Sequence, residues 1–122
     1  MPSIERQQLG RQGEKIAAQF LKSKGLSIRE INSRCSVGEI DIVAEDNDII
    51  VFVEVKTRSS EDFGLPEEAV HYFKQKKLIQ LARYYLQKEQ LQNKRCRFDV
   101  VSIIMTHNRV KKIDHFVDAF SA

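Results

Sequence analysis

Hydrophobic and polar positions recur along this chain with two different periods. Between Glu5 and Lys24, apolar or small residues recur at intervals of three and four, which is the spacing of one buried helical face. They are Leu9, Gly13, Ile16, Ala17, Phe20 and Leu21. Gly25 follows directly and suits the position after a helix end. The pattern therefore predicts a helix over residues 5–24.

Shorter apolar segments with a two-residue period follow this helix. Residues 26–32 alternate loosely, residues 38–44 alternate clearly, and residues 49–58 are apolar on both faces from Ile50 to Val53. The segment from Glu45 to Asp48 has the composition of a tight turn. We expect three strands, with the second and third joined as a hairpin and the third in the centre of a sheet.

The second half of the chain predicts another helix and further strands. After a polar loop from Ser59 to Leu65, Pro66 suits the first turn of a helix that continues to about Gln90. Residues 97–105 read as a strand, and residues 111–117 as a short edge strand or an ordered tail. Together these elements predict one α/β domain over residues 1–122.

Charged residues interrupt two of the apolar strands. Asp41 lies within Gly38–Ala44, and Glu54 and Lys56 lie within Val53–Arg58. Burying a charged side chain costs several kcal/mol unless it is paired or binds an ion. We expect these charged side chains to form a site for a divalent cation, with a water molecule beside it that the site activates.

The hairpin turn decides whether these side chains meet. A two-residue turn at Asn47-Asp48 places Asp41 directly opposite Glu54, with their Cβ atoms about 5 Å apart. Lys56 then shares the face of Glu54, about 7 Å further along. Alternation along residues 38–44 places Ile40 and Ile42 on one face and Glu39, Asp41 and Val43 on the other. A register shifted by one residue would separate Asp41 from Glu54.

These residue types suit the hydrolysis of a phosphodiester bond. Asp41 and Glu54 are hard oxygen ligands for Mg²⁺ or Mn²⁺, and the carbonyl of Val55 can join them. Lys56 could orient or deprotonate the water, or stabilise the leaving charge. Glu14 lies at the border of the first helix's apolar stripe and could support the metal. The alternative is purely structural, with a Lys56–Glu54 pair and Asp41 at a solvated end of the sheet.

The net charge of +3 conceals a strong segregation of charge along the chain. Residues 37–70 carry ten Asp and Glu against two Lys and Arg, whereas residues 71–97 carry eight Lys and Arg against one acid. An acidic centre beside basic segments suits a cation site that receives a polyanion, with Arg58, Lys74 and Lys77 as candidate phosphate contacts. The alternative is that the basic segments are solvated helix faces.

Composition excludes several other classes. Hydrophobic residues make up 42% and charged residues 30% of the chain, which is typical of a folded domain. No apolar run approaches the roughly 18–20 residues of a membrane span, and the first residues do not resemble a signal peptide. Cys35 and Cys96 fit no metal-ligand spacing. We expect a cytoplasmic protein with two reduced thiols and no membrane association.

The same residues resemble a known superfamily. Asp41 followed by Glu54-Val55-Lys56 resembles the metal-site motif of the restriction-endonuclease-like superfamily, with Ile40 in place of the motif's proline. The helix with Glu14 and the element order resemble the archaeal Holliday-junction resolvase branch. More closely, almost the whole chain resembles the small bacterial YraN-type family of predicted nucleases. The matching stretches are Gly13-Glu14 with Ala17, residues 38–44, residues 51–58, residues 66–70 with Lys74 and Lys77-Leu78, and residues 97–101.

This resemblance implies a fold and a function. The fold would be a mixed β-sheet flanked by helices, in the order α-β-β-β-α-β with one further strand as an option. The function would be Mg²⁺- or Mn²⁺-dependent cleavage of DNA, with branched or otherwise structured DNA as one substrate class. Junction cleavage would need two active sites and hence a homodimer, and RNA is a further option. The competing class is a catalytically quiet nucleic-acid-binding or adaptor module that retains the nuclease fold.

Overall fold

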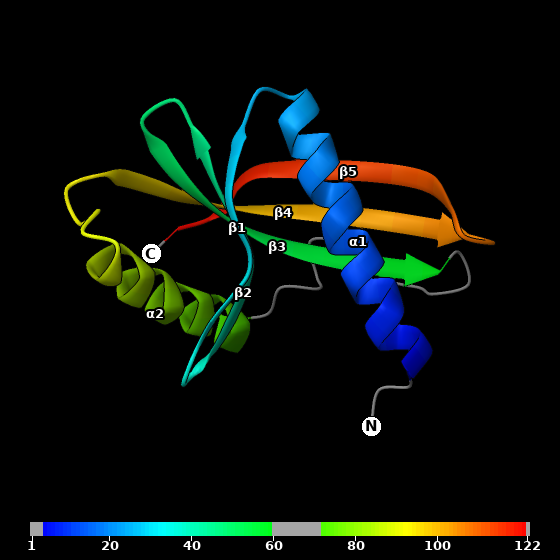
Figure 1. Cartoon of the computed structure of the whole chain (residues 1–122), viewed down its shortest axis with the longest axis horizontal. Coiled ribbons are helices and arrows are strands. Elements are labelled where there is room, and N and C mark those ends of the chain that lie inside the picture. The colour runs from blue at the N-terminus through cyan, green and yellow to red at the C-terminus, as the bar shows by residue number, and fades with distance from the viewer. Residues whose placement is uncertain (1–3, 60–71, 122) are drawn as a thin grey trace.

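The computed structural model describes residues 4–59 and 72–121, which form two helices and five strands. The elements are α1 (Ile4–Ser23), β1 (Ser27–Cys35), β2 (Gly38–Asp46), β3 (Ile49–Ser59), α2 (Tyr72–Lys88), β4 (Arg95–Thr106) and β5 (Arg109–Phe120). The strands form one sheet in sequence order, β1-β2-β3-β4-β5 (Figure 1). Only β3 and β4 are parallel among the neighbouring strands of this sheet, and the other three pairs are antiparallel. The predicted α/β class, mixed sheet and element order are confirmed.

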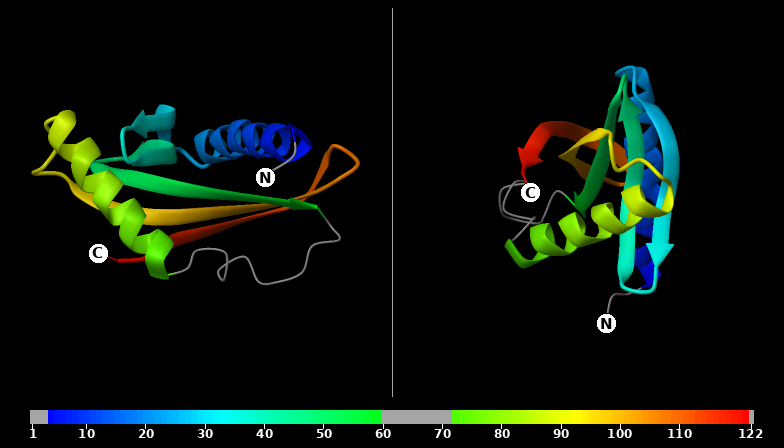
Figure 2. Two further views of the ribbon diagram at one scale, coloured as in Figure 1. Left: turned by 90° about the horizontal axis from the view of Figure 1, so that it is seen from below. Right: turned by 90° about the vertical axis from the view of Figure 1, so that its left-hand side faces the viewer.

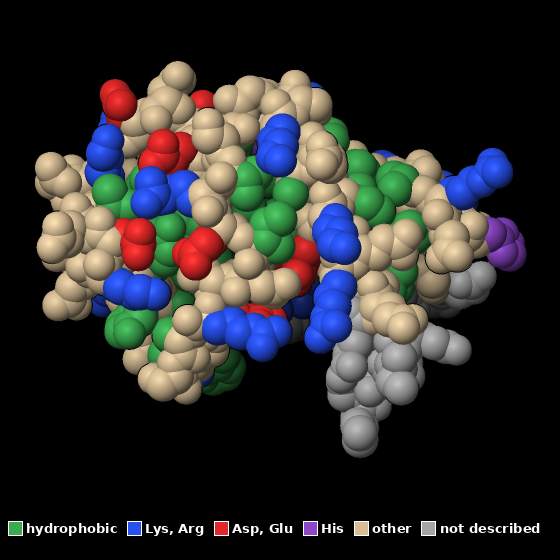
Figure 3. All heavy atoms as spheres, viewed as in Figure 1, with side chains coloured by type: hydrophobic (Ala, Val, Ile, Leu, Met, Phe, Trp, Pro, Cys, Tyr) green, Lys and Arg blue, Asp and Glu red, His purple; other side chains and the backbone are tan. Residues whose placement is uncertain are grey.

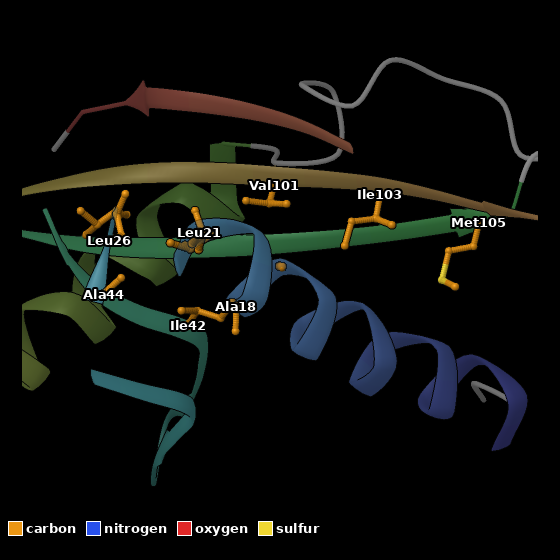
Figure 4. Close-up of a cluster of buried hydrophobic side chains, with 11 residues drawn as sticks. Ala18, Leu21, Leu26, Ile42, Ala44, Val101, Ile103 and Met105 are labelled. Carbon is orange, nitrogen blue, oxygen red and sulfur yellow. The ribbon is translucent and has the colours of Figure 1, made fainter. Parts of the chain in front are cut away.

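The two helices cover opposite faces of the sheet, because β3 is apolar on both sides. Val51 and Val53 pack with Ala17, Ala18 and Leu21 of α1. This cluster extends across β2 and β4 (Figure 4). On the other face, Ile50 and Phe52 pack with Leu78, Leu81, Ala82 and Tyr85 of α2. In Figure 2, α1 lies along one half of β3, while α2 crosses the other half. The expected central position of β3 is therefore confirmed.

Several element boundaries differ from the expected ones. The first strand continues to Cys35, and the C-terminal segment forms a strand of 12 residues rather than a short edge strand or tail. Its exposed positions hide its strand character in the sequence, because an edge strand buries few residues. The expected helix start at Pro66 lies outside the described residues, and α2 ends at Lys88. Cys35 and Cys96 are free thiols, and no helix in residues 4–59 and 72–121 is long and apolar enough to cross a membrane.

The hairpin register is the predicted one. Ile42 pairs with Val53 and Asp46 pairs with Ile49, as a two-residue turn at Asn47-Asp48 requires. The prediction that Ile40 and Ile42 share a face is wrong, since Ile40 packs in the α2 cluster and Ile42 in the α1 cluster. The ladder between β2 and β3 ends at Ile42, and from there β2 pairs with β1 alone. A two-stranded ribbon twists more strongly than a sheet interior, which accounts for the change of face.

A glycine sets the distance between α1 and β3. A Cβ atom on Gly13 would lie 1.8 Å from Oγ1 of Thr57 and 3.0 Å from its Cβ, so the helix backbone contacts the strand directly. Glu14 is the next residue, and this close approach brings its carboxylate to the sheet. Gly10, one turn earlier in the same helix, has nothing within 4 Å of the equivalent position.

Alanine at these two glycines should have opposite effects on stability. Gly13→Ala forces α1 away from Thr57, and we expect the free energy of unfolding to fall by about 1–3 kcal/mol. Gly10→Ala removes a flexible residue from a helix without a clash and should raise it by up to about 1 kcal/mol. Urea unfolding of both variants measures the difference. Equal effects at the two positions would contradict the close approach at Gly13.

A fully buried carboxylate fastens β5 to the rest of the sheet. Asp99 accepts hydrogen bonds from Arg97 Nε at 3.0 Å and from the Asp118 backbone N–H at 2.9 Å, and its other oxygen lies 2.8 Å from His115 Nε2. Arg97 also donates to Asp46 at 2.8 Å. Burial opposes the charge of Asp99, but the hydrogen bonds from His115, Arg97 and Asp118 outweigh it, so the pKa of Asp99 is lowered. This carboxylate is satisfied entirely by its own chain.

Replacing Asp99 with asparagine should destabilise the protein in a pH-dependent way. At pH 7 we expect a loss of about 3–5 kcal/mol, because the cationic partner of a buried ion pair remains. A carboxyl group with a lowered pKa stabilises the fold above its unfolded pKa of about 4, and this stabilisation is lost as the pH falls through its folded pKa. The difference between wild type and variant in urea unfolding should therefore narrow below about pH 4.

The matched control is Asp114→Asn on the same strand pair. Asp114 lies 3.5 Å from Lys112 Nζ with both side chains partly exposed. We expect this change to alter stability by no more than about 0.5 kcal/mol. A cost at Asp99 that stayed constant between pH 7 and pH 3 would indicate lost packing rather than lost charge.

Candidate functional site

The candidate site lies where β2 separates from β3. The last pair of their ladder is Ile42 with Val53, so the backbone of β3 beyond Val53 has no partner in β2. Asp41 compensates for part of this loss, because its Oδ2 accepts a hydrogen bond of 2.8 Å from the Val55 N–H. The expected direct pairing of Asp41 with Glu54 is therefore replaced by a contact between a side chain and the backbone. The fork between the β1–β2 ribbon and β3 is visible in Figure 1.

A cavity of about 490 Å³ opens at this fork, between α1, β2, β3 and α2. Its lining residues are Leu9, Gly10, Glu14, Asp41, Glu54, Val55, Lys56, Thr57 and Lys74. The four residues predicted as catalytic thus converge from three elements, and the predicted phosphate contact Lys74 joins them from α2. The other two predicted phosphate contacts, Arg58 and Lys77, are not among the lining residues.

Three carboxylates lie close together at one side of this cavity, and two of them, Glu14 and Asp41, line it. Glu14, Glu39 and Asp41 each place an oxygen within 4.8 Å of the other two. Burial and the charge of Glu54 raise the pKa of Asp41 to about 8, and burial likewise raises the pKa of Glu14. A protonated Asp41 can then donate to the Glu14 carboxylate, with which it shares a hydrogen bond. A proton shared in this way limits the repulsion between the two acids.

This group fits a divalent cation. Its ligand atoms are hard carboxylate oxygens, which Mg²⁺ and Mn²⁺ prefer. Oε1 of Glu14 is buried and has no hydrogen-bond partner among the described residues, which is costly unless another group satisfies it. A cation at this point would satisfy that oxygen and replace the proton between the acids. The group could therefore hold a metal ion.

Glu54 has a different environment from the other acids. It is buried, with 4% of its surface exposed, and its Oε1 contacts the Nζ atom of Lys74 and lies 3.8 Å from Lys56 Nζ. Burial and the neighbouring Lys74 lower the pKa of Lys56. Burial also opposes the charge of Lys74, but the Glu54 carboxylate outweighs it and the pKa of Lys74 is raised. Glu54 thus favours the charged form of Lys74, whereas the surroundings of Lys56 disfavour its charged form.

Two residues of the site were not singled out from the sequence. Glu39 completes the group of three acids, and it also pairs with Arg34 at 3.1 Å. The sequence does indicate that Glu39 lies near Asp41, since residues two positions apart on a strand share a face. Asn32 hydrogen-bonds the Glu14 carboxylate and has a left-handed backbone with φ of 57°. It lies opposite Asp41 in the β1–β2 pair, and only the folded register reveals this position.

The fold and the site together define a class, a mixed α/β protein with an acidic, lysine-flanked cavity at a fork in its sheet. Residues 13–103 match the uncharacterised protein family UPF0102, and the chain belongs to this family. A UPF0102 protein of Caldanaerobacter subterraneus subsp. tengcongensis is 41% identical, covering 98% of this chain and all of its own length. Others from Geotalea daltonii and Clostridioides difficile are 46% and 47% identical over 92% and 88% of this chain, covering 88% and 92% of their own lengths.

Asn32→Gly tests how the cavity positions Glu14. Glycine accepts the left-handed backbone, so the change removes the amide while leaving the strand unstrained. We expect the affinity for Mn²⁺ to fall by about tenfold or more, as for the loss of other groups that orient metal ligands. Calorimetric titration with Mn²⁺ measures this.

The matched control is Asn47→Gly in the β2–β3 turn, where φ is 55°. The same substitution there keeps a similar backbone and removes an amide outside the cavity lining. We expect its Mn²⁺ affinity and melting temperature to match those of the wild type. Equal affinities in both variants and the wild type would show that Asn32 does not position Glu14.

Proposed function

We propose that this protein is a metal-dependent nuclease that hydrolyses phosphodiester bonds of DNA, with branched or structured DNA as its favoured substrate class. The observation that carries the proposal is the convergence of Glu14, Asp41, Glu54 and Lys56 in one cavity. The resemblance of Asp41 and Glu54-Val55-Lys56 to the restriction-endonuclease-like motif supports it. So does the similarity of most of the chain to the YraN-type family of predicted nucleases.

The cavity assigns a role to each group. A bound Mg²⁺ or Mn²⁺ would polarise the phosphate and lower the pKa of a bound water. In this proposal Asp41, Glu14 and Glu54 hold it, with the Val55 carbonyl as a further ligand, and all four residues line the cavity. Lys56, whose pKa is lowered by burial and by Lys74, is the group proposed to accept a proton from the attacking water.

Charge supports a nucleic-acid partner. Lys and Arg side chains lie beside acidic ones on the face shown in Figure 3, and Lys56 and Lys74 line the cavity together with its carboxylates. Such an arrangement attracts a polyanion while leaving the metal ligands in place. In this proposal Lys74 contacts the scissile phosphate, and Arg58 and Lys77 contact phosphates outside the cavity. Cutting both strands of a junction would require a homodimer.

One observation favours the second candidate, a nucleic-acid-binding or adaptor module without turnover. Glu54 is already neutralised by Lys74 and Lys56 within the chain. A carboxylate paired in this way satisfies its charge without a metal. Glu14 and Asp41 lack such a lysine contact among the described ion pairs, which is why we favour the nuclease.

Cleavage of linear, nicked, flapped and four-way-junction DNA tests the proposal. With Mg²⁺ or Mn²⁺ we expect the wild type to cut at least one substrate. Asp41→Asn and Lys56→Met should lower the rate about 10²–10⁴-fold while DNA binding persists, because each removes a group of the reaction rather than of the binding surface. Mn²⁺ should raise the melting temperature of the wild type and not of Asp41→Asn.

Lys112→Met is the matched control for Lys56→Met. Lys112 lies on β5, outside the cavity, and pairs with the partly exposed Asp114. Its cleavage rate should equal that of the wild type. DNA binding by the wild type without metal-dependent cleavage of any of the four substrates would reject the nuclease in favour of the adaptor.

A further inference from the structure

Lys74 forms an ion pair with the carboxylate that the proposed nuclease needs as a metal ligand. Its Nζ atom contacts Oε1 of Glu54, which is also the oxygen that lies 3.8 Å from Lys56 Nζ. Glu54 is 4% exposed, so the carboxylate of this ion pair is shielded from solvent. Lys74 also interacts electrostatically with Asp41. The positive charge of the lysine therefore lies among the acids that would bind the cation.

An ammonium and a divalent cation cannot both use this oxygen without cost. Two like charges a few ångströms apart repel strongly where water is excluded. A cation that binds Glu54 must therefore displace Lys74 or accept its repulsion. Removing the charge of Lys74 should strengthen metal binding, which is the opposite of what the loss of a metal ligand would do.

Of the two lysines near Glu54, Lys74 is the one whose ammonium group can move away from the carboxylate. Its side chain is 41% exposed against 27% for Lys56, and it comes from the first turn of α2 rather than from the central strand. A lysine side chain has a flexible stem of four methylene groups and can move its ammonium by several ångströms without any change in the backbone. A phosphate at the mouth of the cavity would offer the ammonium a new partner.

We propose that Lys74 is an internal counter-ion that competes with the divalent cation for Glu54, and that a phosphate of the nucleic acid relieves this competition by taking the ammonium. This inference rests on the proposed function. Metal and nucleic acid then bind cooperatively, and each raises the affinity for the other by the same factor. Cation binding is thereby weak in the free protein and strengthens where a substrate phosphate is present.

Mn²⁺ titration of the free protein tests the competition without any measurement of activity. Lys74→Met keeps the length and apolar stem of the side chain and removes its charge. We expect it to bind Mn²⁺ about tenfold more tightly than the wild type, within the usual range of coupling between sites. Lys74→Arg keeps the charge and should remain as weak as the wild type. Lys88→Met, in the last turn of the same helix, is the control and should not change the affinity.

A second titration includes a duplex with phosphorothioate linkages, checked afterwards for integrity. This duplex should tighten Mn²⁺ binding to the wild type by about the same tenfold factor and have little effect on Lys74→Met. Equal or weaker Mn²⁺ binding by Lys74→Met in the free protein would overturn the inference and leave the nuclease proposal standing. Absence of Mn²⁺ binding by both proteins, with and without DNA, would overturn the two together.

Discussion

The site depends on one hydrogen bond, from the Val55 N–H to the carboxylate of Asp41. A backbone donor on a central strand must be paired, and an adjacent strand normally pairs it. Here a side chain takes over at the point where the ladder ends, so β2 can turn away and leave space beside β3. Had the ladder continued past Ile42, strand backbone would fill the place of the cavity. The same contact fixes Asp41 against the strand that carries Glu54 and Lys56.

The sequence predicts the strands of the site better than their divergence. The turn at Asn47-Asp48 determines the register, because the favoured hairpin has two residues in its loop. That loop length fixes which residue of β2 pairs with which residue of β3. Glu14 was recognisable from its position at the border of an apolar stripe. The fork was not, since it arises from the twist of a two-stranded ribbon, which also moves Ile40 to the opposite face from Ile42.

The packing of elements that are distant in the sequence accounts for the other residues of the site, which the sequence alone did not place. Asn32 reaches Glu14 only because Gly13 lets the helix contact the sheet. Lys74 was recognisable as one basic residue of a basic segment, and as such it suited a phosphate. Its contact with Glu54 depends on where α2 crosses the sheet, which no local pattern encodes. Local periodicity thus indicates which side chains face inward, and packing decides which of them meet.

Two carboxylate sites in this chain show what distinguishes a structural acid from a candidate ligand. Asp99 is fully buried, yet Arg97, His115 and a backbone N–H satisfy it and its pKa is lowered. Asp41 receives a single backbone hydrogen bond, faces two other acids and has its pKa raised to about 8. Burial alone therefore does not explain the difference. The fold satisfies the buried carboxylate of Asp99 completely, yet it leaves Asp41 close enough to two other acids for their charges to repel. This repulsion costs stability unless a cation binds there.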